Sequence, residues 1–101
     1  MRPLANPERV YDTRQTGNPM AAGEVRRVTI GGTQAFVHVT YLTTAYGWVS
    51  VSGTDTRSAS SLVNADSDGV ASSGAPISLP DGDLRVYCSA AGDIVVDVYA
   101  R

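Results

Sequence analysis

Short runs of alternating apolar and polar residues, separated by turn-forming residues, constrain the fold of this chain more than any other feature. The longest run covers residues 34–44, and β-branched and aromatic side chains dominate it. Such side chains suit a pleated sheet surface and are less favourable in a helix. Both faces of the run are partly apolar, which predicts a central strand with some cover on each side.

Shorter segments repeat the strand pattern between turn signals. They are residues 24–30, 48–52, 60–64, 76–80, 84–88 and 93–99. The prolines that bound residues 76–80 favour an edge position, and we expect residues 84–88 and 93–99 to form a hairpin. The polar stretch at residues 58–74 indicates a loop, or a surface segment ordered only by a neighbour. The sequence therefore predicts an all-β fold, an antiparallel β-sandwich or jelly-roll-like domain of about seven to eight short strands.

Composition narrows the classes of protein. The chain has 101 residues, a hydrophobic fraction of 43% and a formal net charge of −2. This length suits one ordered domain, and the charge gives no electrostatic reason to expect nucleic acid. No apolar run approaches the ~20 residues of a membrane span, and the first residues lack the apolar core of a secretory signal. We expect synthesis in a cytoplasm, without export by the usual route.

The residues that carry most enzyme chemistry are scarce. His38 is the only histidine and Cys88 the only cysteine, and both fall within predicted strands. We expect His38 on a sheet face and Cys88 in the core, so a catalytic triad or thiolate metal site lacks partners. The acidic pairs Asp66/Asp68 and Asp81/Asp83 suit turns better than a calcium loop. The sequence predicts no enzyme activity, no metal and no cofactor.

A polar motif near the N-terminus is the most distinctive segment. Pro-Glu-Arg-Val-Tyr-Asp-Thr-Arg occupies residues 7–14. The Asp12 carboxylate can accept hydrogen bonds from backbone N–H groups and from the guanidinium of Arg9 or Arg14. We expect Arg9, Asp12, Thr13 and Arg14 to form a structural clamp that pins the N-terminal segment to the sandwich. A ligand site made of the same residues is the alternative.

This segment resembles the Pro-x-Arg-(Val/Leu)-x-Asp-Thr-Arg signature of a β-sandwich domain of actinobacterial secreted proteins and actinobacteriophage virion proteins. Five further segments match in the same order: Ala-Gly (22–23), Ala-Phe-Val-His-Val-Thr (35–40), Gly-Trp-Val-Ser-Val (47–51), Ser-Leu-Val-Asn (61–64) and Ile-Val-Val-Asp-Val-Tyr (94–99). The resemblance spans nearly the whole chain. It departs at residues 31–34, where Gly-Gly-Thr-Gln replaces a Val-Pro-Ala insertion, and at the end, where an aromatic pair is missing.

The resemblance implies a virion structural protein. We expect a capsid decoration protein on the capsid surface, with the major capsid protein and copies of itself as partners, as a homotrimer. The sequence divides into an N-terminal arm at residues 1–8 and a single β-sandwich domain at residues 9–101. Arg2, Pro3 and Leu4 in the arm are candidate contact residues, because prolines keep such a segment extended and inexpensive to order.

A binding module for carbohydrate or cell wall is the alternative function. Tyr46 and Trp48 flank Gly47 where two predicted strands meet. Aromatic side chains at the end of a sandwich can stack on a sugar ring, although the same residues also suit core or interface packing. This alternative places the chain on a phage tail or in a secreted protein, and it expects both rings to be exposed.

Overall fold

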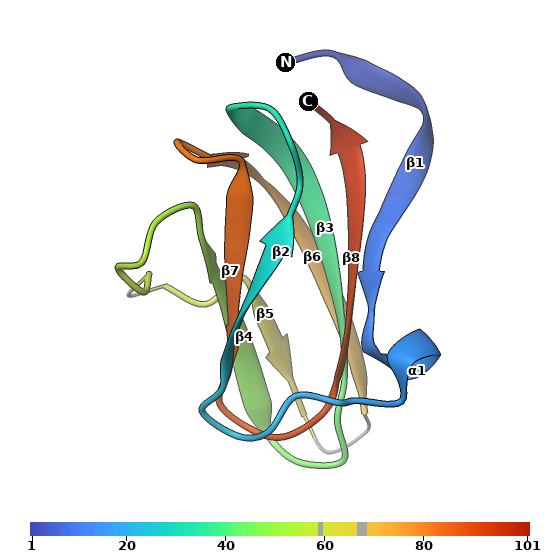
Figure 1. The fold of residues 1–101 in the computed structure, drawn as a ribbon. Coiled ribbons are helices and arrows are strands. Elements are labelled where there is room, and N and C mark those ends of the chain that lie inside the picture. The colour runs from blue at the N-terminus through green and yellow to red at the C-terminus, as the bar shows by residue number, and fades with distance from the viewer. Residues whose placement is uncertain (59, 67–68) are drawn as a thin grey trace.

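The chain folds into two antiparallel sheets that pack face to face (Figure 1). The computed structural model describes residues 1–58, 60–66 and 69–101. Within them lie β1 (Pro3–Asp12), α1 (Thr13–Thr16), β2 (Val25–Thr29), β3 (Gln34–Leu42), β4 (Gly47–Ser52), β5 (Val63–Ala65), β6 (Val70–Ser78), β7 (Asp83–Cys88) and β8 (Asp93–Ala100). Sheet I has the order β1-β8-β3-β6, and sheet II has the order β2-β7-β4-β5. The predicted all-β antiparallel sandwich is confirmed.

Alternate residues of the strands build one core between the sheets. β3 lies centrally, between β6 and β8, as the long apolar run predicted. The fully buried side chains include Val37, Val39, Tyr41, Val49, Leu84, Val86, Cys88, Ile94, Val96 and Val98. Burying one such aliphatic side chain contributes about 1.5–3 kcal/mol. Cys88 is a core residue, and burial raises the pKa of its thiol. Among the described residues, no helix has the length and apolarity of a membrane span.

The expected hairpin between the last two strands is wrong. β7 lies in sheet II and β8 in sheet I, so the connection at residues 89–92 crosses from one sheet to the other. Its last residue, Gly92, bridges Met20, and a Cβ there would clash with the Leu42 carbonyl. The close backbone approach at Gly92 accompanies a connection that crosses between the two sheets. The alternating sequence of two successive strands is the same for such a crossing and for a hairpin, so the sequence could not distinguish them.

For residues 58–74 the loop interpretation is wrong in part, and the alternative of a segment ordered by a neighbour describes β6. This stretch contains β5 and the first half of β6, while residues 59, 67 and 68 lie outside the described residues. β6 pairs with β3 along its whole length, from Gln34↔Ser78 to Leu42↔Val70. The neighbouring strand therefore organises this polar sequence, because a ladder needs backbone groups and not apolar side chains. The edge position expected for the Pro76 strand is confirmed.

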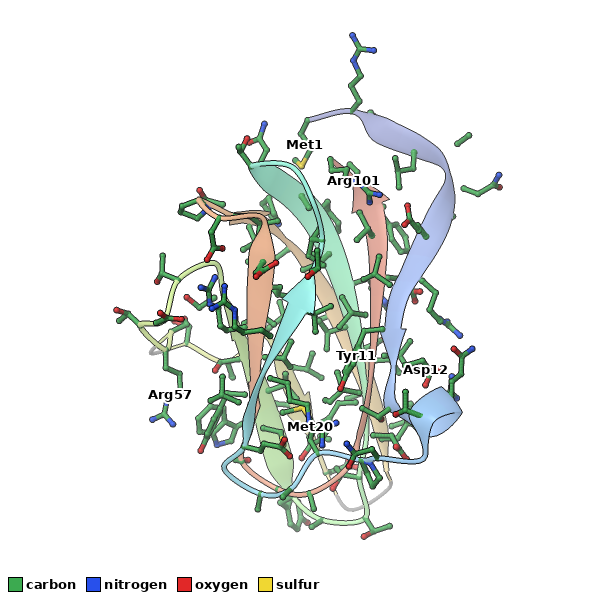
Figure 2. The ribbon with its side chains drawn as sticks, viewed as in Figure 1. Met1, Tyr11, Asp12, Met20, Arg57 and Arg101 are labelled. Atoms are coloured by element: carbon green, nitrogen blue, oxygen red, sulfur yellow. The ribbon has the colours of Figure 1, made fainter. Side chains whose placement is uncertain are left out.

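The boundary between an arm at residues 1–8 and a domain at residues 9–101 is not found. β1 runs through this position and pairs with β8, through Pro3↔Ala100 and Glu8↔Val98. Arg2 and Arg101 exchange two backbone hydrogen bonds of 2.9 and 3.0 Å, which places the two ends of the chain together (Figure 2). The reason is that β8 would otherwise be an open edge, and an extended proline-containing segment can pair with it.

Candidate functional site

The clamp predicted around Asp12 brings its four residues together. Asp12 caps α1: its Oδ1 accepts from the Arg14 backbone N–H at 3.0 Å, and its carboxylate accepts from the Arg14 guanidinium at 3.0 and 2.9 Å. Arg9 lies 3.7 Å from the same carboxylate and donates two hydrogen bonds to Asp97. The hydrogen bonds from Arg14 hold the pKa of Asp12 below its usual range, against the opposing effect of burial.

Thr13 fastens the clamp to β8. Its hydroxyl is fully buried, donates to Asp93 Oδ1 at 2.7 Å and accepts from the Ile94 backbone N–H at 3.0 Å. Donor and acceptor capacities of this hydroxyl are both used. These contacts hold the end of β1 and α1 against sheet I. The geometry is that of a structural clamp.

The two aromatic residues singled out as a sugar platform are not in contact as a pair. Tyr46 is 77% exposed in the loop before β4. Trp48 is half-buried on the outer face of sheet II, where its ring centroid lies 5.0 Å from that of Tyr87. The aromatic partner of Trp48 is therefore on β7. Sequence spacing cannot show this, because the contact depends on which strands pair in the sheet.

The remaining candidate groups, His38 and the acidic pair Asp81/Asp83, contact neighbouring side chains of the sandwich. His38 lies on the outer face of sheet I, with its ring 5.5 Å from that of Tyr99. Asp81 and Asp83 form ion pairs with arginines, while Asp68 lies outside the described residues. Within residues 1–58, 60–66 and 69–101, no three histidine, cysteine or acidic side chains gather as metal ligands would.

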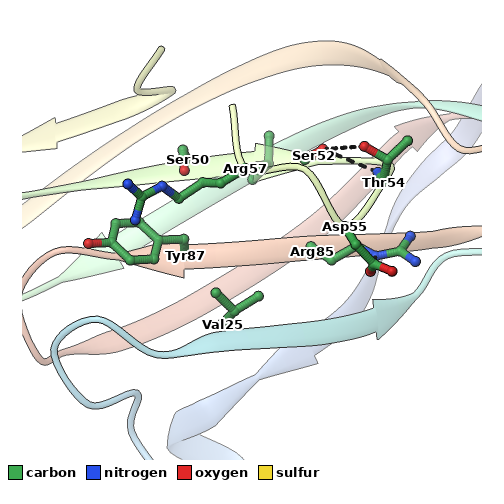
Figure 3. Close-up of a pocket in the computed structure, with 9 residues that line it drawn as sticks. Val25, Ser50, Ser52, Thr54, Asp55, Arg57, Arg85 and Tyr87 are labelled. Atoms are coloured by element: carbon green, nitrogen blue, oxygen red, sulfur yellow. Dashed lines mark hydrogen bonds and ion pairs between the residues drawn. The ribbon is translucent and has the colours of Figure 1, made fainter. Parts of the chain in front are cut away.

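A small pocket of about 30 Å³ on the outer face of sheet II is the best candidate site (Figure 3). We call it the Arg57 pocket. The loop that follows β4 folds back over β4 and β7 and forms one wall. The lining residues are Val25, Ser50, Val51, Ser52, Thr54, Asp55, Arg57, Arg85 and Tyr87.

Arg85 holds this loop in place. It points outward from β7, yet it is only 7% exposed because the loop covers it. Its guanidinium donates to the Gly53 carbonyl at 2.9 Å, to Asp55 at 3.0 Å and to Asp81 at 2.8 and 2.6 Å. The hydrogen bonds from Arg85 lower the pKa of Asp81 well below its usual range. Arg85 therefore positions the loop, and its charge is paired with the carboxylates of Asp55 and Asp81.

Arg57, at the end of the same loop, is held by aromatic rings. Its guanidinium carbon lies 4.3 Å from the ring centroid of Tyr87 and 6.0 Å from that of Trp48. Beside it lies Ser50, whose side chain lines the pocket from β4 and is the cross-strand partner of Tyr87 (Figure 3). Ser50 is 1% exposed, and its hydroxyl has no hydrogen-bond partner among the described residues. Sequence reasoning missed both residues as site residues, since their neighbourhood depends on the pairing of β4 with β7.

Comparison with known proteins adds no relative. A scan against models of protein families gives no match, and a search of curated proteins gives no significant match. The resemblance of residues 7–14 to the virion and secreted domain stays a prediction, and the geometry of the Arg57 pocket is argued on its own.

Proposed function

We propose that this chain is a non-enzymatic structural protein of a phage virion, a capsid decoration protein that binds the capsid surface through the outer face of sheet II. The observation that carries the proposal is the cluster of Trp48, Tyr87 and Arg57 on that face. These three residue types dominate the binding energy of protein interfaces. The resemblance of residues 7–14 to a domain of phage virions gives the setting.

The edges of sheet I support association with further copies. β6 is an edge strand of nine residues without a charged side chain, and Val70 at its start is 67% exposed. Unpaired backbone groups on such an edge are a template for pairing with another chain. The proposed assembly is a homotrimer, one of the cyclic forms that closed homo-oligomers adopt. The major capsid protein and copies of the chain itself are the proposed partners.

Mass in solution and capsid binding test the proposal. We expect size exclusion with light scattering to give three times the 10.6 kDa of one chain. Cosedimentation with capsids of the encoding phage should then show saturable binding. A monomer that also fails to sediment with capsids contradicts the proposed function.

The N-terminal residues supply a second, separable test. Residues 4–7 lie between the paired positions Pro3 and Glu8 of β1, where the register with β8 shifts. Deletion of residues 1–6 therefore removes little of the ladder, and we expect the truncated domain to stay folded. If Arg2, Pro3 and Leu4 contact the capsid, the truncated chain loses capsid binding. Retained binding removes these three residues from the proposal.

Glycan binding is the second candidate, and the Trp48–Tyr87 pair is the observation that favours it. A sugar ring packs on an open aromatic face. Here Arg57 already lies over the two rings, which makes a protein partner the better fit. If glycans are the ligand, Trp48→Ala loses binding to envelope glycans and keeps its melting temperature. Binding of glycans by the wild-type chain at micromolar concentration would favour this second function.

A further inference from the structure

Arg57 carries a positive charge that no carboxylate of the described residues neutralises. Six of the other seven arginines form ion pairs: Arg9, Arg14, Arg26, Arg27, Arg85 and Arg101. Arg57 instead lies over Tyr87 and Trp48. A guanidinium stacked on a ring keeps its N–H groups available at the rim, where they match a carboxylate with two parallel hydrogen bonds.

The Ser50 hydroxyl points to the same conclusion independently. It lines the pocket beside Arg57, is 1% exposed and has no hydrogen-bond partner in the part of the chain that the structure describes. Buried hydroxyls in folded proteins nearly always have a partner, so one without a partner in a pocket indicates a missing group. A bound oxygen acceptor would supply that group.

The side of the pocket formed by Val25 and Tyr87 is apolar. Val25 is 54% exposed and is the cross-strand neighbour of Tyr87, so an isopropyl group and an aromatic ring lie side by side at the pocket. An isolated charged ligand would leave this wall in water. A carboxylate on a short aliphatic stem would cover it.

We propose that the Arg57 pocket binds the side-chain carboxylate of a glutamate presented by a partner protein. The carboxylate pairs with the Arg57 guanidinium, an oxygen accepts from the Ser50 hydroxyl, and the two methylene groups pack against Val25 and Tyr87. This inference rests on the proposed function, because it names the chemistry that the capsid surface presents to this face.

Charge and shape favour a protein carboxylate over other anions. Asp55 also lines the pocket and pairs with Arg85, which pairs with Asp81 as well, so Arg57 is the lining guanidinium without a carboxylate partner among the described residues. One guanidinium matches a singly charged carboxylate, whereas a phosphate with up to two charges would face the acidic neighbour uncompensated. The stacked Arg57 also occupies the rings on which a sugar would pack.

Trp48 provides the readout. It is the only tryptophan of the chain and lies 6.0 Å from the Arg57 guanidinium carbon, so its fluorescence reports on the pocket. We would titrate the full chain with N-acetyl-glutamate N-methylamide and with its glutamine counterpart, at constant ionic strength. We expect a saturable change with a dissociation constant of about 1 mM for glutamate, in keeping with so small a ligand, and at least tenfold weaker binding for glutamine. No saturation, or equal binding of both, overturns the inference.

Variants place the binding in the pocket. We expect Arg57→Gln to lose glutamate binding at least tenfold and Ser50→Ala to weaken it several-fold. Arg27→Gln is the matched control, because it removes the same charge from an exposed arginine that does not line the pocket. Melting temperatures of the two glutamine variants should equal that of the wild type. Tighter binding of glucuronate than of the glutamate probe would assign the pocket to an acidic sugar and overturn the proposed partner.

Capsid cosedimentation separates this inference from the proposed function. If the wild-type chain binds capsids and Arg57→Gln weakens that binding, both stand. Equal capsid binding by wild type and Arg57→Gln overturns the pocket and leaves the function. Glutamate binding without capsid binding retains the pocket chemistry and overturns the virion role.

Discussion

Two polar clusters on opposite sides of the sandwich differ in whether their hydrogen-bonding capacity is used (Figure 2). In the clamp, the hydroxyl of Thr13 both donates and accepts, and the Asp12 carboxylate accepts from backbone and guanidinium. In the Arg57 pocket, the Ser50 hydroxyl has no partner and Arg57 has no carboxylate among the described residues. The saturated cluster stabilises the fold, while the unsaturated one has capacity left for another molecule.

The difference also separates two arginines of one face. Arg85 is 7% exposed and spends its donors on the loop, whereas Arg57 is exposed and stacks on rings. Arg85 thus does for the pocket what Thr13 does for the clamp: it fixes backbone in place. Substitutions at these residues should change the free energy of unfolding. We expect the largest loss where hydrogen-bonding groups are fully paired, and a gain where the group is unpaired.

The largest loss of stability is expected for Arg85→Met. The change keeps the apolar stem and removes the donors to the Gly53 carbonyl and Asp81, so the loop loses its anchor. We expect the free energy of unfolding to fall by about 3 kcal/mol, the upper range for a buried group left without its partner. Urea denaturation measures it. Fluorescence titration of the same variant should show no glutamate binding, because Arg57 is no longer positioned.

Arg27→Met is the matched control. Arg27 has the same side chain, lies on the neighbouring strand β2 and pairs with Asp81 and Asp83, but its side chain is 55% exposed. Exposed ion pairs contribute about 0–1 kcal/mol. An Arg85→Met variant no less stable than Arg27→Met would contradict a positioning role for Arg85.

A smaller loss is expected for Thr13→Val, which preserves shape and removes the hydroxyl. The Ile94 backbone N–H would remain buried without an acceptor, and Asp93 would lose a donor. Leaving a buried donor unsatisfied costs about 1–3 kcal/mol, so we expect a loss of about 2 kcal/mol in urea denaturation. Thr16→Val is the control, since its hydroxyl meets only a carbonyl of the same exposed turn. Equal losses for the two variants would show that Thr13 does not fasten the clamp.

These residues show where sequence reasoning succeeds and where it stops. The contacts of Asp12 with Arg14 and Arg9 were predictable because these residues are close in the chain, and local hydrogen bonding depends on spacing. The contacts of Thr13 and Arg9 with β8 were not, because they form only when β1 pairs with β8. The sandwich was predictable because its strands alternate. The pocket was not, because Ser50, Arg57 and Tyr87 meet only after β4 pairs with β7. The hairpin was misassigned because the strand order, which places β7 and β8 in different sheets, is not visible in the sequence. The polar half of β6 is a strand because it pairs with β3.

Low pH should weaken the clamp. The pKa of Asp12 is lowered mainly by hydrogen bonds from Arg14, so the folded state prefers the ionised carboxyl. A depressed pKa adds stability above the ordinary carboxyl range, near pH 4, and this stability is lost as pH falls through the folded value. We expect Asp12→Asn, which keeps an acceptor for the cap, to flatten the fall in melting temperature between about pH 4 and pH 2. A slope unchanged from wild type would contradict the assignment.

For Ser50→Ala, the change in the free energy of unfolding is expected to have the opposite sign. Ser50→Ala removes a buried hydroxyl that has no partner, and such a group opposes folding. We therefore expect the free energy of unfolding to rise by up to about 1 kcal/mol, whereas removing the paired hydroxyl of Thr13 lowers it. Ser52→Ala, on the same strand, is the control: its hydroxyl donates to the Thr56 carbonyl at 2.9 Å, so its removal should cost about 0.5–1 kcal/mol. A residue whose loss stabilises the fold while weakening glutamate binding is retained for binding, because stability alone would have replaced it. Destabilisation by Ser50→Ala as large as that by Ser52→Ala would show that the hydroxyl has a structural partner, and the contrast between the two clusters would fail.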